Sequence, residues 1–219
     1  MNFEKSTTMS VRRIAVSFGI FLLIPILRFS LWEAIGSDTL ALMFALNVSA
    51  WLLLLYDWEL FALHWNRTKQ NFADTVLYTV VGSVVLFFWT WLSNKYFPRT
   101  IVLPDPTVFT SDPIAIPGVL FAFSLSLGFI LNMEFKCLTD HMKVHAREVA
   151  MILFTGFVFG LIYSAAFGPY RWTSLIPTYL YNVILFILLS YLYNQTHSII
   201  PGILSFAIVY LSWMIFFAA

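Results

Sequence analysis

The sequence FKCLTDHMKVHAREVAMILFTGFVFGLIYSAAFG stands at residues 135–168, and YNQTHSIIPGILSFAIV stands at residues 193–209, with a further hydrophobic segment between them. In the first stretch a charged segment gives way to an apolar run of about 20 residues, the length that crosses a hydrocarbon core of about 30 Å. The run is apolar on every side, whereas a helix of a soluble protein keeps a polar face. The C-terminal third therefore predicts successive membrane-spanning helices.

The composition of the whole chain agrees with this prediction. Hydrophobic residues make up 60% of the sequence and charged residues only 11%, whereas about a quarter of the residues of a soluble protein are charged. The sequence shows no roughly ten-residue alternating strands of the kind that form membrane β-barrels. We expect an all-α, polytopic membrane helical bundle embedded in the lipid bilayer.

Charge and cysteine content exclude other classes. The net charge is +1 without a basic stripe, so no nucleic acid is expected as a partner. The single Cys137 excludes a disulfide within the chain. The first apolar run resembles a secretory signal, but Arg28 interrupts its far end and no small-residue cleavage site follows, so we expect it to be retained as a span.

We predict one domain, 1–219, with about seven spans. Their expected bounds are 14–32, 38–62, 74–94, 114–135, 149–167, 173–193 and 199–218. The connection after the third span, from Lys95 to Pro113, holds four prolines, which predict an extended loop rather than a further domain.

The distribution of lysine and arginine predicts the orientation. The connections on the side of the N-terminus hold Lys5, Arg12, Arg13, Arg67, Lys69, Lys136, Lys143 and Arg147, and the opposite side holds Lys95, Arg99 and Arg171. This excess predicts a cytoplasmic N-terminus and, for seven spans, an external C-terminus. An eighth, re-entrant segment would reverse only the second of these predictions.

Three segments of the C-terminal half carry a resemblance to a known family: Phe135-Lys136-Cys137, the run FVFGLIY at residues 157–163, and THSIIPGIL at residues 196–204. In order and spacing they resemble the framework words F-R-G, L-F-G-L and T-G-S-L-W-x-P-I-L of the CPBP family (CAAX-protease and bacteriocin-processing proteins, also called Abi proteins). The resemblance covers about 80 residues and implies a CPBP-like core in the C-terminal half. It also implies a bacterial cytoplasmic membrane as the location.

The family's catalytic motifs, E-E-x-x-x-R, F-x-x-x-H and H-x-x-x-N, are replaced at the matching positions. The residues found there are Leu131, Asn132, Lys136, Tyr163, Phe206 and Tyr210. Hydrolysis of this kind needs carboxylates and imidazoles to hold a metal or activate water, and phenyl and phenol groups do not replace imidazole as metal ligands. We therefore expect no catalytic residue and no cofactor, and we favour a protein that is not an enzyme.

Two other groups near the first motif segment are candidates for a chemical site. Glu134 lies two positions from the expected second glutamate, but a shift of two residues turns a helix by about 200° and points the carboxylate away from the bundle. His141 and His145, with Glu148, have the spacing of a zinc site on one helix face. This segment is also the most charged of the chain, so a solvated connection between spans is the favoured interpretation.

Charged residues near the spans give a further set of candidates. Arg28 lies inside the first span and is expected either to extend to the headgroups or to serve a function. Asp57 and Glu59 are expected to end the second span, to contact Arg67 or Lys69, or to line an ion pathway. Arg28, Asp57 and Glu59 are also possible partner contacts.

Polar side chains of the last spans give the final candidate site. Tyr163, Tyr179, Asn182 and Tyr210 either line a pocket where the family's active site was or make hydrogen bonds between helices. The high aromatic content also allows a contiguous aromatic docking face.

Three functions follow from these observations. The favoured one is a non-catalytic CPBP-like membrane protein that binds and regulates or stabilises another integral membrane protein: an enzyme, a transporter or part of a bacteriocin-related system. The alternatives are a diverged intramembrane metalloprotease and a small transporter or transporter subunit that uses Arg28, Asp57 or Glu59.

Overall fold

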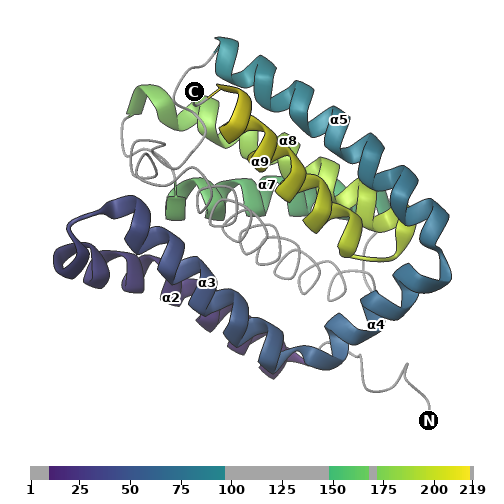
Figure 1. The fold of residues 1–219 in the computed structure, drawn as a ribbon, viewed down its shortest axis with the longest axis horizontal. Coiled ribbons are helices and arrows are strands. Elements are labelled where there is room, and N and C mark those ends of the chain that lie inside the picture. The colour runs from purple at the N-terminus through teal and green to yellow at the C-terminus, as the bar shows by residue number, and fades with distance from the viewer. Residues whose placement is uncertain (1–9, 97–147, 168–171, 218–219) are drawn as a thin grey trace.

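A computed structural model describes residues 10–96, 148–167 and 172–217 of the 219. The described part is helical, with no strand in these ranges (Figure 1). Its helices are α2 (Val11–Ile35), α3 (Asp38–Tyr56), α4 (Trp58–Gln70), α5 (Phe72–Tyr96), α7 (Glu148–Phe167), α8 (Trp172–Thr196) and α9 (Ile200–Phe217). The all-α class predicted from the sequence is confirmed for these residues.

Three of the described helices are long and apolar enough to cross a membrane, and a bent pair allows a fourth. The three are α2, α5 and the Leu175–Thr196 part of α8, and the bent pair is α3 with α4. Several helices of this kind indicate a membrane protein. The count of seven spans stays a prediction, and the expected span 114–135 lies outside the described residues.

The expected span 38–62 is not one straight helix. Helix α3 ends at Tyr56, and α4 begins at Trp58 after a bend of 85°. Asp57 lies at the bend with φ −106° and ψ 29°, and its side chain is completely buried. The hydrophobic pattern of the sequence did not predict the bend. The sequence remains largely apolar on both sides of Asp57, and the chain bends at this one buried residue.

Helices α2 and α3 form an antiparallel hairpin, which Figure 1 shows apart from the group formed by α5, α8 and α9. The turn between them is closed by Gly36, which has the left-handed φ of 72° that glycine adopts without a Cβ penalty. Its backbone N–H donates to the carbonyl of Trp32, and Ser37 caps the next helix by accepting from the backbone N–H of Leu40. Helix α4 then connects the hairpin to α5 (Figure 1).

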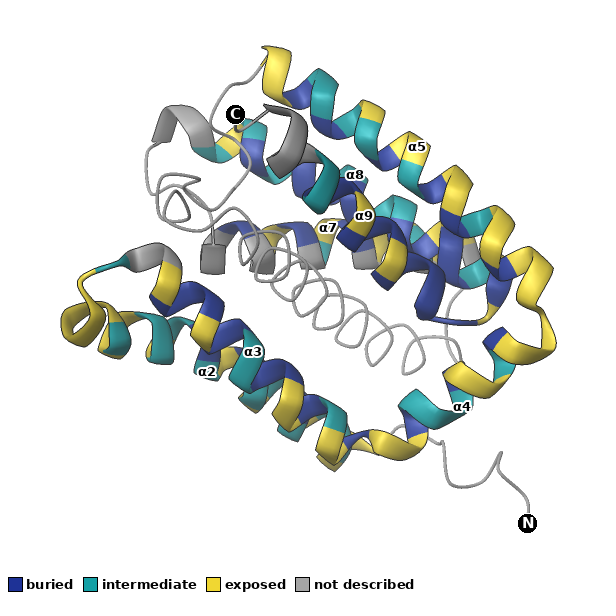
Figure 2. Ribbon diagram, viewed as in Figure 1, coloured by how far each residue is buried: buried dark blue, intermediate teal, exposed yellow. Residues whose placement is uncertain are grey.

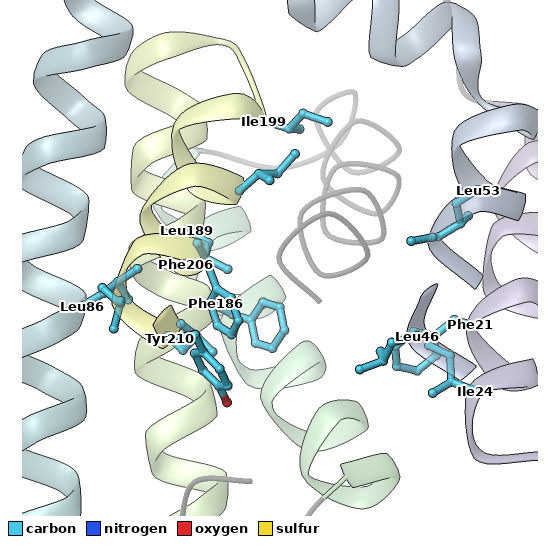
Figure 3. Packing of buried hydrophobic residues seen from close by; sticks show 14 of the residues in the cluster. Phe21, Ile24, Leu46, Leu53, Leu86, Phe186, Leu189, Ile199, Phe206 and Tyr210 are labelled. Carbon is cyan, nitrogen blue, oxygen red and sulfur yellow. The ribbon is translucent and has the colours of Figure 1, made fainter. Parts of the chain in front are cut away.

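Figure 2 shows buried residues on the inward faces of these helices and exposed residues on the outward faces. Many of the exposed residues are large and apolar. Figure 3 shows two gatherings of buried residues: Phe21, Ile24, Leu46 and Leu53 between α2 and α3, and Leu86, Phe186, Leu189 and Phe206 among α5, α8 and α9. Outward residues such as Leu77, Val84 and Phe88 of α5 are exposed. Such a surface is stable in hydrocarbon and not in water.

Helices α7 and α8 approach closely at two glycines. A Cβ added to Gly160 would lie 2.9 Å from the backbone nitrogen of Val183, and one added to Gly156 would lie 2.6 Å from Cγ1 of Ile187. Gly156 and Gly160 are four residues apart, so both face α8. This is the small-xxx-small pattern that lets membrane helices pack with their backbones near one another.

Candidate functional site

Two of the residues that the resemblance placed at replaced motif positions form an aromatic stack on α9. The ring centroids of Phe206 and Tyr210 lie 4.6 Å apart, with an angle of 22° between the planes. Both side chains are buried. Their spacing of four residues places them on one helix face, and this face points towards α5 and α8.

A second layer of aromatic and polar groups lies against this stack. The hydroxyl groups of Thr90 and Tyr181 are 3.1 Å apart and share a hydrogen bond. The ring of Trp89 is stacked on that of Tyr181 at 6.2 Å, and its indole N–H donates to the carbonyl of Tyr181. A polar pair is thus enclosed by rings from α5 and α8.

The side chains at the junction of α5, α8 and α9 are closely packed. Leu86, Thr90, Tyr181, Leu185, Phe206, Val209 and Tyr210 surround a gap with no room for a water molecule. Hydrolysis needs an attacking water within reach of a general base. The gap between these seven described side chains is too small to hold such a water.

The expected pocket of tyrosines and Asn182 is divided between two sides of α8. Tyr210 belongs to the aromatic stack, whereas the amide of Asn182 donates to the hydroxyl of Ser164 on α7 at 2.8 Å. Tyr179 is half-buried, and Tyr163 lies on α7 without a described side chain. For Asn182, the interpretation as a hydrogen bond between helices is the one that the geometry favours.

Several other sequence candidates lie outside the described residues. Leu131, Asn132 and Lys136 do so, and so do His141 and His145. Glu148 begins α7, but its side chain is not described. In the described ranges, no three side chains of His, Cys, Asp or Glu gather closely enough to hold a metal ion.

Asp57 is the centre of a buried ionic site at the bend between α3 and α4. Its Oδ1 atom lies 2.8 Å from Nε of Arg13, and its Oδ2 atom accepts a hydrogen bond of 3.0 Å from Ser17. Glu59 lies 3.7 Å from the same arginine but is largely exposed. The two acidic residues therefore contact Arg13 of α2, and not Arg67 or Lys69, which was one of the alternatives expected from the sequence. Arg28 lies half-buried farther along α2.

Arg67 instead holds the turn between α8 and α9. Its Nη1 atom donates to the backbone carbonyl of His197 at 3.0 Å. The hydroxyl of Ser198 donates to the carbonyl of His64 at 3.2 Å and lies 3.0 Å from the hydroxyl of Thr68. The same hydroxyl accepts from the backbone N–H of Ile200, which caps the start of α9.

Sequence reasoning missed Arg13, Ser17 and Ser198 as contact residues. The predicted topology puts Arg13 on the same side of the membrane as Asp57, so this ion pair could have been predicted. Only Arg67 and Lys69, which follow Asp57 closely in the sequence, were considered as its partners. Ser17 lies four residues after Arg13 and shares its helix face, which is a second available signal. No pattern in the sequence indicated that Ser198 would contact α4.

Comparisons with known proteins add no assignment: no protein-family model matches this chain, and no curated protein or solved structure matches it either.

Proposed function

We propose that this chain is a non-catalytic, CPBP-like integral membrane protein that binds and stabilises or regulates another membrane protein. The observation that carries the proposal is the Phe206–Tyr210 stack, in which rings 4.6 Å apart fill the positions of the family's second histidine and its asparagine. The phenyl ring of Phe206 has no proton to give or to accept, and its stacking on Tyr210 contributes packing energy.

The turn before α9 supports the CPBP-like part of the proposal. His197 stands where the framework word T-G-S has glycine, and its φ of 50° is the left-handed conformation that favours glycine. Gly160, from the framework word F-G-L, allows the close approach of α7 to α8. At these two framework positions, a backbone conformation and a close helix contact account for the preference for glycine, and neither depends on catalysis.

A groove between α5 and α9 supports the partner-binding part. Its volume is about 580 Å³, and it is lined by Ser83, Val84, Phe87, Phe88, Trp91, Ile208, Val209 and Ser212. Small serines among large rings let a helix backbone come close, while the rings provide dispersion contacts. The occupant that fits is an apolar transmembrane helix of the partner.

The test is affinity purification of the tagged chain from native membranes in mild detergent. A stoichiometric integral membrane protein is expected to stay bound to the wild-type chain. Val84→Trp places an indole in the groove and is expected to release that protein. Val80→Trp is the matched control, because Val80 lies one turn away on the same helix, is 56% exposed and does not line the groove.

The outcomes separate the proposal from its alternatives. Retention of the partner by both variants would place its contact elsewhere, and the absence of any partner from the wild type would reject the binding function. Chelator-sensitive cleavage of a peptide by the purified chain would favour the metalloprotease. Flux in reconstituted vesicles that Asp57→Asn abolishes would favour the transporter.

The orientation belongs to the same proposal. We propose a cytoplasmic N-terminus, because Arg12 and Arg13 lie at the start of α2 beside the α3–α4 bend, and Arg67 and Lys69 lie in the last turn of the short helix α4 that follows the bend. Cysteine labelling from the two sides of a sealed vesicle tests it.

A further inference from the structure

Helix α4 carries a ladder of aromatic rings that ends at a lysine. The ring centroids of Trp58 and Phe61 lie 5.9 Å apart, and those of Phe61 and Trp65 lie 6.4 Å apart with 16° between the planes. The Nζ atom of Lys69 lies 5.7 Å from the centre of the Trp65 ring. Steps of three and four residues keep the whole ladder on one helix face.

The two faces of α4 differ sharply in burial. Leu60, His64 and Thr68 are buried on one face, while Trp58 is 57% exposed and Trp65 45% exposed on the ladder side. Two exposed indoles within about two turns of one helix are unfavourable in water. Tryptophan is enriched at the boundary between headgroups and hydrocarbon, where its ring is apolar and its N–H stays hydrated.

The bend at Asp57 gives α4 the direction that such a boundary requires. Because α4 turns by 85° from α3, it runs across the end of the bundle and does not continue the line of α3 (Figure 1). The helix also becomes more polar along its length, since His64, Asn66, Arg67 and Gln70 follow the aromatic start. A helix of this kind lies in the plane of the membrane interface.

Two basic residues stand at the Lys69 end of α4, and Asp74 in the first turn of α5 is the acidic residue that follows them. Arg67 and Lys69 occupy the last turn of α4, and Glu59, its acidic residue, lies in the first turn near Arg13. Arg67 is engaged with the carbonyl of His197. The ammonium group of Lys69 lies 5.7 Å from the centre of the Trp65 ring and is held there by cation–π attraction, beside the exposed indole.

We propose that the Trp58–Phe61–Trp65–Lys69 face of α4 is a binding site for an anionic phospholipid. The rings lie against the glycerol and upper acyl region, and Lys69 contacts the phosphate. One lysine near a charged membrane surface is worth about a fivefold preference for an anionic lipid.

The experiment uses the full chain purified in a neutral detergent. Dioleoyl-phosphatidylglycerol and dioleoyl-phosphatidylcholine are added separately, and the lipids retained per protein are counted by native mass spectrometry. The wild type is expected to retain the anionic lipid in preference to the neutral one, and Lys69→Gln is expected to lower this preference about fivefold. Lys69→Arg keeps the charge and is expected to keep the preference.

Lys95→Gln is the matched control, because Lys95 lies 5.1 Å from the ring centre of Trp91 in the same type of contact, but at the end of α5, a helix long and apolar enough to cross the membrane and not one that lies along its surface. Its preference is expected to equal that of the wild type. A thermal transition measured for each variant shows that it is folded. Equal retention of both lipids by the wild type, or equal losses in Lys69→Gln and Lys95→Gln, overturns the site. Unchanged lipid retention by Lys69→Gln with loss of a co-purifying protein would assign the face to a protein contact instead.

Discussion

The Nε atom of Arg13 lies 2.8 Å from Oδ1 of Asp57, and this contact ties the start of α2 to the point where α3 bends into α4. The carboxylate is completely buried and the arginine is 17% exposed. The pair therefore fixes where α4 leaves the line of α3, and α4 in turn holds the α8–α9 turn through Arg67 and Thr68.

The first prediction concerns this ion pair. Asp57→Asn leaves the guanidinium of Arg13 without its counter-charge in a largely buried place, so the free energy of unfolding is expected to fall by about 3–5 kcal/mol. Glu59→Gln is the control, because its carboxylate is 65% exposed and 3.7 Å away; exposed pairs contribute less than about 1 kcal/mol. Thermal unfolding in detergent measures both, and equal small effects would show that the Asp57 contact does not stabilise the bend.

The second prediction concerns the contact of α7 with α8. Gly160→Ala would place a Cβ 2.9 Å from a backbone nitrogen and 3.0 Å from a Cα, both of Val183. A backbone does not rotate aside as a side chain does, so the helices must separate, at a cost of about 1–3 kcal/mol. Unfolding of the variant is measured by the same thermal assay.

Gly19→Ala is the control for this change. Gly19 lies within α2, and no atom outside its own helix lies within 4 Å of the added Cβ. The substitution is expected to be neutral or to stabilise by up to about 1 kcal/mol, because alanine favours the helix. If both alanine variants unfold at the wild-type temperature, the glycines are not the reason for the close approach.

The sequence predicted the helices that the surrounding hydrocarbon requires. Runs of apolar residues must be helical in hydrocarbon, and the expected bounds 74–94 became Phe72–Tyr96. The direction of α4 was not predictable in this way, because it depends on Asp57 meeting Arg13 and Ser17 from another helix. Similarly, Tyr210 and Asn182 were grouped by polarity, although the structure engages them with different neighbours.

The third prediction tests the replaced motif positions. Phe206→His with Tyr210→Asn introduces the histidine and asparagine that the proposed CPBP resemblance implies, but it removes a buried ring stack and buries polar groups. Each buried polar group left without a partner costs about 1–3 kcal/mol, so the double variant is expected to unfold at a lower temperature. It is expected to bind no zinc, because Leu131, Asn132 and Tyr163 supply no carboxylate or imidazole.

Phe206→Leu serves as the control for this pair, since it shortens the ring without adding a polar group. Metal content is measured by elemental analysis after purification and dialysis. One tightly held zinc per double variant, together with cleavage of a peptide, would mean that other residues complete a site and that the chain is a diverged protease.

The last prediction concerns His197, whose φ of 50° is positive, alone among the non-glycine residues of the described ranges. A side chain in this conformation costs about 1–2 kcal/mol, whereas glycine adopts it without that cost but loses more entropy on folding. His197→Gly is therefore expected to raise the free energy of unfolding by on the order of 0.5 kcal/mol, because the first effect is the larger. The bond from Arg67 goes to the backbone carbonyl and is retained. His197→Val is expected to destabilise, because a β-branched residue is the least suited to positive φ. Thermal unfolding decides between them: a glycine variant less stable than the wild type would show that the imidazole makes a contact worth more than the strain it causes.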